Sequence, residues 1–255
     1  MDFVITVFLM IIGSIMGSFL GCMGYRIPNK IKTTYPSSFC SSCKKPLKWY
    51  MNIPIISYIY QGGRCAYCKK KIGFIYFLCE VMGMFLFAFN YILFRFNIEF
   101  FIATILSSVL IVTIVSDFEY YYISDRVLVI SSLFLLITYF CFMDTNDILI
   151  RILTGILLFI FMFGVKILGN SMFGRESLGD GDIKLMGVIG LSLGLLNSFV
   201  ALFFAALTGL IYSIIALRKN PEGLIPFGPF IVIGALLVIY LSPIITPYLE
   251  YLFSI

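Results

Sequence analysis

Two pairs of cysteines give this chain its clearest metal-binding pattern. Cys40 with Cys43, and Cys65 with Cys68, form two C-x-x-C pairs separated by 21 residues, slightly more than is usual in zinc ribbons. Four thiolates at this spacing suit a tetrahedral zinc site. Such a closed site has no open position for water, so we expect the zinc to fold the loop rather than to catalyse. Disulfides, unliganded thiols and redox chemistry are the alternatives, and a cytosolic position would argue against stable disulfides.

Two aspartates at the ends of apolar stretches are the candidates for catalysis. Asp117 ends one stretch, and Asp182 opens another in a Gly-Asp-Gly-Asp sequence that contains Gly179 and Gly181. The chain contains no histidine, which removes the usual general base and every nucleophile that depends on histidine. Two neighbouring aspartates share a proton, so that one activates water while the other protonates the carbonyl oxygen or the leaving group. The glycines would let the backbone approach a substrate closely.

The same acidic residues also have a purely structural interpretation. Asp182 can cap a helix, and Asp117 and Asp125 can be ordinary charges at a membrane interface, with Asp125 capping the following helix. Glu80 lies inside an apolar stretch, which makes it either a functional residue or the buried partner of a basic group. The residues alone leave both interpretations open.

The composition requires membrane-spanning helices to position these residues. Hydrophobic residues make up 61% of the chain, charged residues 12%, and the mean hydropathy is +1.04. A soluble domain of this size cannot bury so much apolar surface. A hydrocarbon core of about 30 Å takes roughly 20 apolar residues per helix, and irregular loops cannot cross it because unpaired backbone groups in lipid are costly. We predict an all-α, polytopic membrane bundle of about eight transmembrane helices with a small cytoplasmic four-cysteine zinc-binding loop.

Apolar runs and their breakers place the predicted spans. The first run lacks a basic start and a clear cleavage site, so we expect a retained span rather than a signal peptide. The run from Ile183 to Leu217 is too long for one helix, and we expect it to fold back at Gly194 to Asn197. The chain then divides into a first transmembrane span (1–25), a basic four-cysteine loop (26–72) and a transmembrane core (73–255). The predicted spans lie near residues 3–24, 74–94, 99–116, 127–143, 148–168, 183–195, 197–217 and 229–252.

The basic residues set the orientation of the predicted bundle. Ten of the 18 Lys and Arg residues fall between Arg26 and Lys71, a stretch without any acidic residue. The positive-inside rule makes this loop cytoplasmic and the N-terminus external, and 16 of the 18 basic residues then agree with one topology. Asp117 and Asp182, 65 residues apart, both reach the cytoplasmic membrane boundary. The net charge of +5 is explained by anionic lipid headgroups, so we expect no nucleic acid as a partner.

Several motifs in a fixed order resemble the bacterial type IV prepilin peptidases, which are aspartyl proteases of the GxGD type. Ser124 stands where the family usually has proline, a change that alters the turn and not the acid. The matching segments are Gly17–Leu20, Tyr25–Pro28, the two cysteine pairs with Pro46–Tyr50 and Asn52–Pro54 between them, Asp117 with Ile123–Asp125, Gly179–Leu185, and Ile225–Phe230.

The resemblance implies an aspartyl endopeptidase with Asp117 and Asp182 as its catalytic dyad. Such an enzyme removes the short basic leader of prepilins or pseudopilins between Gly and usually Phe, at the cytoplasmic face of the inner membrane. Asp125 would orient its loop and Lys184 would tune a nearby carboxylate. The core at 73–255 would be the peptidase.

The long cysteine-containing loop also implies a second activity. Members with this loop methylate the new N-terminal amine with S-adenosylmethionine, and Asn52 and Glu80 are the candidate residues for it. No glycine-rich nucleotide motif supports this activity, so it depends on the analogy alone.

Two other classes of membrane protein, and one closer relative, are alternatives. A thiol oxidoreductase would use the C-x-x-C pairs as a redox couple and bind little zinc. An ion transporter would carry its acids at mid-depth, whereas Asp117 and Asp182 lie at span ends. A preflagellin peptidase would share the dyad, but the cysteine-rich loop disfavours it.

Overall fold

The apolar stretches of the sequence form helices in the computed structural model. The structure describes residues 1–33, 35, 37–174, 177–219 and 225–253, and within these ranges it contains no strand. The long helices are α1 (Asp2–Arg26), α3 (Phe74–Phe94), α4 (Ile98–Tyr120), α5 (Asp125–Phe142), α6 (Thr145–Phe173), α7 (Asp180–Leu193), α8 (Leu195–Lys219) and α9 (Gly228–Phe253). The loop between α1 and α3 carries the short helices η1 (Trp49–Asn52) and α2 (Ile56–Tyr60). The predicted all-α, multi-pass fold is confirmed.

Not every long helix is long enough to cross a membrane by itself. Among the described residues, α1, α3, α4, α5, α6 and α8 are each long and apolar enough to do so. In α9, the apolar stretch whose side chains the structure describes is Gly228–Ser242. Helix α7 has 14 residues, which at 1.5 Å per residue is about 21 Å and less than the hydrocarbon core. The structure therefore agrees roughly with the predicted number of helices, and α7 is short, as the predicted span 183–195 already was.

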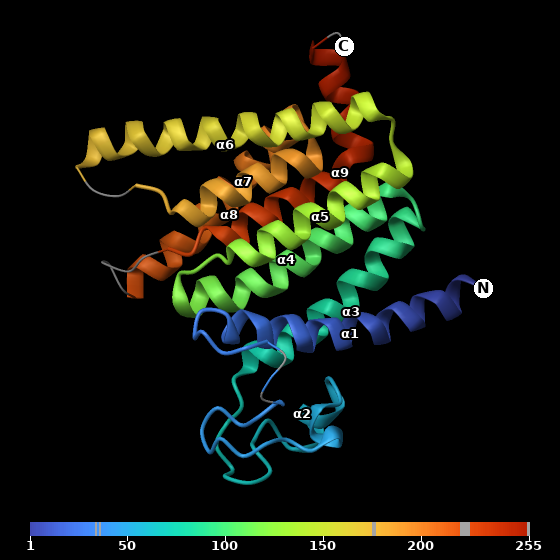
Figure 1. Cartoon of the computed structure of the whole chain (residues 1–255), viewed down its shortest axis with the longest axis vertical. Helices are drawn as coiled ribbons and strands as arrows, with labels where there is room; N and C mark the ends of the chain where they lie inside the picture. Colours follow the sequence, from blue (N-terminus) through green and yellow to red (C-terminus); the bar gives the residue numbers. More distant parts are fainter. Residues whose placement is uncertain (34, 36, 175–176, 220–224, 254–255) are drawn as a thin grey trace.

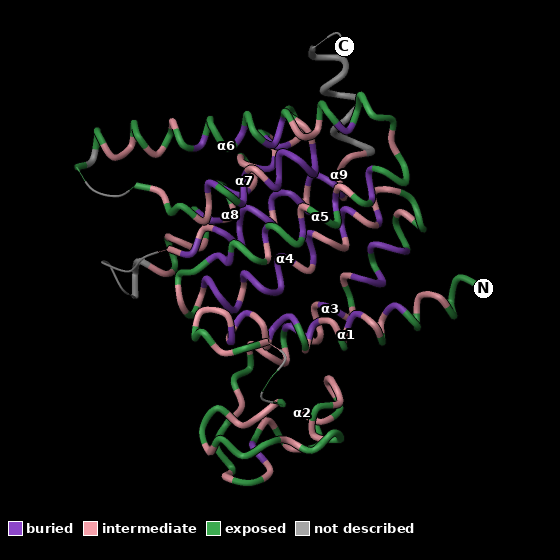
Figure 2. Tube along the Cα trace, viewed as in Figure 1, coloured by how far each residue is buried: buried purple, intermediate pink, exposed green. Residues whose placement is uncertain are grey.

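Helix α4 lies at the centre of the bundle. It packs against α1, α3, α5 and α9, and it is the most buried of the six candidate spans. Figure 2 shows buried residues along α4, α7 and α9, whereas α6 is largely exposed. Many large apolar side chains of α5, α6 and α8 are exposed, as on a lipid-facing surface. Asp117 thus belongs to the most buried of the six candidate spans.

The hairpin from α7 to α8 turns at Gly194, as the sequence predicts. Gly194 has φ of +80°, which lies in the left-handed region that favours glycine. Tyr139 of α5 donates its hydroxyl proton to the carbonyl oxygen of Leu191 at 2.8 Å, and Arg151 of α6 donates to that of Ser192 at 3.1 Å. These bonds satisfy carbonyl groups at the C-terminal end of α7 that have no partner within the helix.

The connections place the chemically active segments at one end of the bundle. The C-terminal ends of α4 and α6 and the N-terminal ends of α5, α7 and α9 lie at the end opposite the N-terminus of the chain (Figure 1). The four-cysteine loop leaves the bundle from the C-terminal end of α1 and returns at the start of α3. This arrangement brings the Asp117 and Asp182 segments together.

Candidate active site

A pocket of about 250 Å³ lies where α4 ends and where α5 and α7 begin. Both candidate aspartates line this pocket, although they come from different helices. The lining residues are Asp117, Tyr121, Tyr122, Ile123, Asp125, Gly179, Asp180, Gly181, Asp182 and Lys184. The structure thus brings together the two carboxyl groups and four further residues that the sequence singled out, namely Asp125, Gly179, Gly181 and Lys184.

Asp117 is held in the last turn of α4 by the beginning of α9. Asp117 is only 6% exposed, and its Oδ2 atom accepts a hydrogen bond of 3.0 Å from the backbone N–H of Gly228. Gly228 is the first residue of α9, and N–H groups at a helix start have no partner inside the helix. The positive end of the α9 dipole therefore faces the Asp117 carboxylate.

Asp182 occupies the first turn of α7 without capping it. The N-cap position is held by Gly179, and α7 has no side-chain cap hydrogen bond. The Oδ1 atom of Asp182 is buried and has no hydrogen-bond partner within the described part of the chain. A buried carboxylate oxygen without a partner is costly, so its presence beside Asp117 in a pocket indicates a ligand-binding or reacting group.

Two glycines allow these elements to approach one another around Ile123. A Cβ atom on Gly181 would lie 2.8 Å from Cβ of Ile123, and one on Gly228 would lie 2.7 Å from its Cδ1. Both distances are too short for real Cβ contacts, so a side chain at either position would displace its helix. Gly179 is close to the catalytic candidate itself, since its Cβ would lie 3.2 Å from Oδ2 of Asp182.

Two lysines tie the start of α7 to its neighbouring helices. Lys184 of α7 bonds Asp125 of α5 at 2.8 Å, and Lys166 of α6 bonds Asp180 of α7 at 2.6 Å. Exposed ion pairs contribute little to stability, about 1 kcal/mol at most. We therefore infer that these ion pairs position the start of α7 at the edge of the pocket and add little to the stability of the fold. The Lys184–Asp125 pair also shows that Asp125 has a partner other than a helix cap; the N-cap of α5 is Ser124.

The four cysteines converge on a point, as the sequence predicts. The Sγ atoms of Cys40, Cys43, Cys65 and Cys68 all lie within 4.8 Å of one another, and those of Cys40 and Cys68 are 3.9 Å apart. Tetrahedral Zn–S bonds of about 2.3 Å would separate sulfur atoms by roughly 3.8 Å. The donor set and its spacing fit a four-thiolate zinc site.

The two cysteine turns have the same backbone design. In the first turn, Cys40 N–H donates to Lys45 O at 3.0 Å and Lys44 N–H donates to Cys40 O at 2.8 Å. In the second turn, the corresponding donors and acceptors are Cys65 with Lys70 and Lys69 with Cys65, each at 2.9 Å. Lys44 and Lys69 also share a φ of 59°. The repeated geometry indicates two metal-binding turns that face one metal ion.

The thiols of the cluster differ in how readily they ionise. Burial opposes ionisation of Cys40, but the backbone N–H groups of Cys43 and Ser42 and the neighbouring thiols lower its pKa to about 7. A backbone hydrogen bond from Lys70 stabilises the thiolate of Cys68, yet burial and the other three cysteines raise its pKa to about 11. Deprotonation of Cys68 at neutral pH therefore needs the charge of a metal ion.

Comparisons with known proteins agree with this geometry. Two family models match: the Bacterial Peptidase A24 N-terminal domain over residues 11–94 and the Type IV leader peptidase family over residues 104–214. A prepilin leader peptidase/N-methyltransferase of Bacillus subtilis is 32% identical over 246 residues, which cover 95% of this chain and 97% of the relative. The chain belongs to the type IV leader peptidase family. The predicted family and the predicted enzyme class are thereby confirmed.

Two further relatives are similar to this chain over nearly their whole length. The prepilin leader peptidase/N-methyltransferase of Vibrio cholerae is 28% identical over 262 residues, covering 94% of this chain and 98% of the relative. That of Pseudomonas aeruginosa is 27% identical over 271 residues, covering 94% and 92%. No solved structure is significantly similar to the chain.

The two candidate residues for methylation lie apart from the pocket of this leader peptidase. Asn52 is exposed at the end of η1. Glu80 lies in α3, and its two carboxylate oxygens accept hydrogen bonds from Ser18 Oγ at 2.7 Å and from the backbone N–H of Ile55 at 2.6 Å. Both oxygens of Glu80 thus have protein partners in the described part of the chain, and the assignment of these two residues to S-adenosylmethionine stays a prediction.

Some residues of the site were not predicted from the sequence. The Ile225–Phe230 motif is visible in the sequence, but its contact with Asp117 through Gly228 is not, because 111 residues separate the two partners. Tyr121, Tyr122 and Ile123 also line the pocket; the spacing between Asp117 and Asp125 is the signal that could have pointed to them. The hydrogen bonds of Glu80 likewise depend on the packing of α1 against α3.

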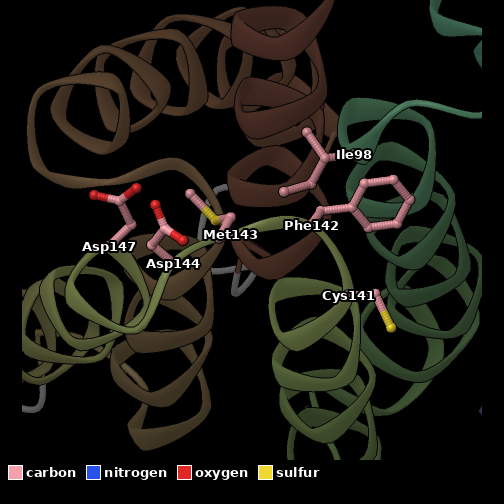
Figure 3. Close-up of a pocket in the computed structure, with 6 residues that line it drawn as sticks. All are labelled: Ile98, Cys141, Phe142, Met143, Asp144 and Asp147. Carbon is pink, nitrogen blue, oxygen red and sulfur yellow. The ribbon is translucent and has the colours of Figure 1, made fainter.

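A larger pocket of about 510 Å³ lies at the opposite end of the bundle and differs in character. Figure 3 shows Asp144 and Asp147 next to each other, with Ile98 and Phe142 on the other side of Met143. Asp147 lies in the first turn of α6 and Asp144 is the residue before this helix. No aspartate from a second helix joins them in the lining. The smaller pocket is therefore the candidate active site.

Proposed function

We propose that this protein is a membrane aspartyl endopeptidase that removes the leader of type IV prepilins or pseudopilins, with Asp117 and Asp182 as its catalytic pair. The observation that carries the proposal is their meeting in one pocket, with the Asp182 Oδ1 atom buried and unpartnered. The family membership and the names of the relatives support the substrate class. The scissile bond is of the Gly-Phe type.

The hydrogen bonds of the pocket suggest which aspartate acts as the general base and which as the general acid. The Gly228 N–H stabilises Asp117 as a carboxylate, which makes Asp117 the base that takes a proton from water. Asp182 has a buried oxygen without a donor, and this oxygen is free to hold the shared proton. The water oxygen attacks the peptide carbonyl carbon while Asp182 protonates the carbonyl oxygen. The tetrahedral intermediate then collapses: Asp117 gives its proton to the leaving amine, and the hydroxyl proton returns to Asp182.

The orientation of the bundle is part of the proposal. The pocket lies at the same end of the bundle as the attachment of the basic loop, whose ten Lys and Arg residues favour the cytoplasmic side. A prepilin leader at the cytoplasmic face of the inner membrane would reach the pocket directly. The N-terminus would then be external.

Replacement of either aspartate tests the mechanism. We expect Asp117→Asn and Asp182→Asn each to abolish cleavage of a co-expressed prepilin, because an amide can neither take nor give the catalytic proton. The measurement is the mass of the pilin product, with membrane insertion checked by immunoblot. Asp147→Asn, in the larger pocket at the other end of the bundle, is the matched control and should cleave normally. Cleavage by either dyad variant at the wild-type rate would refute the mechanism.

The two cofactors are proposed separately. Cys40, Cys43, Cys65 and Cys68 would hold a structural Zn²⁺, which gives the loop its fold. The names of the relatives support methylation of the new N-terminal amine with S-adenosylmethionine, for which Asn52 and Glu80 stay candidates. The described contacts of these two residues add no support. The mass of the same pilin product reports methylation as one added methyl group.

A further inference from the structure

The loop that carries the cysteines also contains an apolar segment that neither zinc nor the dyad explains. Residues 49–60 read WYMNIPIISYIY and contain no charged side chain. An apolar run of about 10–14 residues is too short to cross a bilayer and is typical of an interfacial or re-entrant segment. The structure folds this run as η1 and α2, joined by a sharp turn.

Hydrogen bonds hold this segment beside the bundle rather than beyond its end. Glu80 binds the backbone N–H of Ile55 and the hydroxyl of Ser18. Glu80 is six residues from the start of α3 and Ser18 is eight residues from the end of α1, which places them about 9–12 Å inside these helix ends at 1.5 Å per residue. Figure 1 shows α2 below α1 and α3 in this view, within the loop that joins them. Ile55 is therefore held beside two helices that are long and apolar enough to cross a membrane, short of their ends.

The turn at Ile55 is strained, and Glu80 stabilises it. Ile55 has φ of 63° and ψ of −54°, and Ile56 N–H bonds Pro54 O at 2.6 Å, which makes a γ-turn with positive φ. Such a turn is rare, and for a β-branched residue it costs about 1–3 kcal/mol. The charge-assisted bond to Glu80 offsets this cost. A strained turn fixed by a carboxylate inside the bundle indicates that the position of α2 matters.

The segment has one packed face and one uncovered face. Tyr58 stacks on Phe77 of α3, with ring centroids 4.6 Å apart. The opposite side chains are apolar or aromatic and strongly exposed: Trp49 80%, Tyr50 45%, Ile56 65%, Ile59 66% and Tyr60 91%. We call these five residues the loop anchor.

We propose that the loop anchor is inserted into the cytoplasmic leaflet of the membrane, at the boundary between headgroups and acyl chains. The hydrogen bond from Ile55 to Glu80 holds the segment beside α3, a helix that is long and apolar enough to cross a membrane. Trp and Tyr are enriched at this boundary, and short amphipathic segments bury their apolar face about 5–10 Å into it. The ten Lys and Arg residues of the same loop, with no acidic residue, match an anionic leaflet. The lipid thus positions the four-cysteine loop against the bundle, independently of catalysis.

The single tryptophan of the chain, Trp49, allows a direct test. The full-length protein is reconstituted into phosphatidylcholine/phosphatidylglycerol vesicles whose lipids carry bromine on the upper acyl chain, a contact quencher of indole. We expect Trp49 to emit at short wavelength and to lose most of its intensity in brominated vesicles, while aqueous iodide quenches it little. Emission at long wavelength, quenched by iodide and unaffected by brominated lipid, would overturn the proposal.

Matched variants separate the anchor from the rest of the loop. In Trp49→Tyr with Tyr67→Trp, the indole moves to the second cysteine turn, where Lys45 lies 5.5 Å from the ring of residue 67, and we expect the quenching pattern to reverse. In Ile56→Ser with Ile59→Ser, we expect quenching of Trp49 by brominated lipid to weaken by at least half. A quenching pattern that instead depends on added prepilin, or on dilution of the protein in the membrane, would assign the surface to the substrate or to a second copy and would overturn the lipid assignment.

Discussion

Single side chains decide the geometry of the pocket because its walls meet at van der Waals distance. Ile123, in the connection between α4 and α5, contacts the positions of both Gly181 and Gly228, so one branched side chain lies against the starts of α7 and α9. Asp117 and Asp182 can keep their mutual position only while both glycines stay without side chains. The G-x-G-D motif therefore combines an acid with the space that the acid requires.

We expect Gly181→Ala to reduce cleavage without preventing folding. The added Cβ would lie 2.8 Å from Ile123 Cβ, and overpacking of this kind costs about 1–3 kcal/mol. If Asp182 is displaced by that strain, the cleavage rate falls by about 10- to 100-fold. The rate is measured on a prepilin in detergent or vesicles. Gly164→Ala is the matched control, because nothing lies within 4 Å of its Cβ, and it should cleave normally.

A second substitution tests whether the effect is steric. Ile123→Gly removes the colliding Cβ atom together with the rest of the side chain, so the double variant Gly181→Ala with Ile123→Gly should cleave faster than Gly181→Ala alone. If the double variant is as slow as the single one, the collision with Ile123 is not the cause.

The sequence predicted the acids and thiols of this site but not their partners. Asp117, Asp182 and the four cysteines stand out because their types and spacing are rare in an apolar chain. The Gly228 N–H and the Ser18 hydroxyl do not stand out, because a backbone group or a serine gains its role only through tertiary packing. Asp125 shows the same limit: it was expected as a helix cap or an orienting residue, and the structure pairs it with Lys184.

Helices α1 and α3 show how elements of this bundle approach closely. A Cβ on Gly83 would collide with the carbonyl oxygen of Gly13, and a Cβ on Gly24 would lie 2.6 Å from Cβ of Val115 in α4. In lipid, no hydrophobic force drives helices together, so small residues that permit close backbone contact are favoured at such interfaces. Hydropathy predicted where these helices run, but it could not predict this interface, because a close backbone contact depends on which faces of the two helices meet.

We expect Gly83→Leu to separate α1 from α3 and to destabilise the protein. Overpacking at this backbone contact costs about 1–3 kcal/mol or more, seen as a lower unfolding temperature in detergent. The dyad lies on α4 and α7, away from this contact, so the fraction that stays folded should still cleave prepilin. Gly164→Leu, on the exposed helix α6, is the control of equal size change. Equal unfolding temperatures for the two variants would contradict the close-packing role of Gly83.

For the whole molecule, the zinc loop and the helical core are expected to respond separately to metal removal. A chelator, or Cys43→Ser, should release one zinc ion per chain and make residues 27–73 sensitive to protease, because four thiolates define the fold of this loop. Cleavage of prepilin should persist, since the pocket contains no residue of the loop. Metal analysis and limited proteolysis measure the first effect. Unchanged protease resistance after complete zinc loss would show that the metal does not fold the loop.

The orientation of the whole bundle can be tested with a cysteine that the chain already contains. Cys141 is exposed and lines the pocket at the end opposite the dyad, so it should lie outside if the basic loop is cytoplasmic. A membrane-impermeant maleimide should label wild-type protein in right-side-out vesicles, and Cys141→Ser should lose that label. Ser177 is exposed near the start of α7, so Ser177→Cys in the Cys141→Ser background should be labelled only in inverted vesicles. The opposite pattern would place the dyad and the basic loop outside, where the cytoplasmic leader of a prepilin could not reach them.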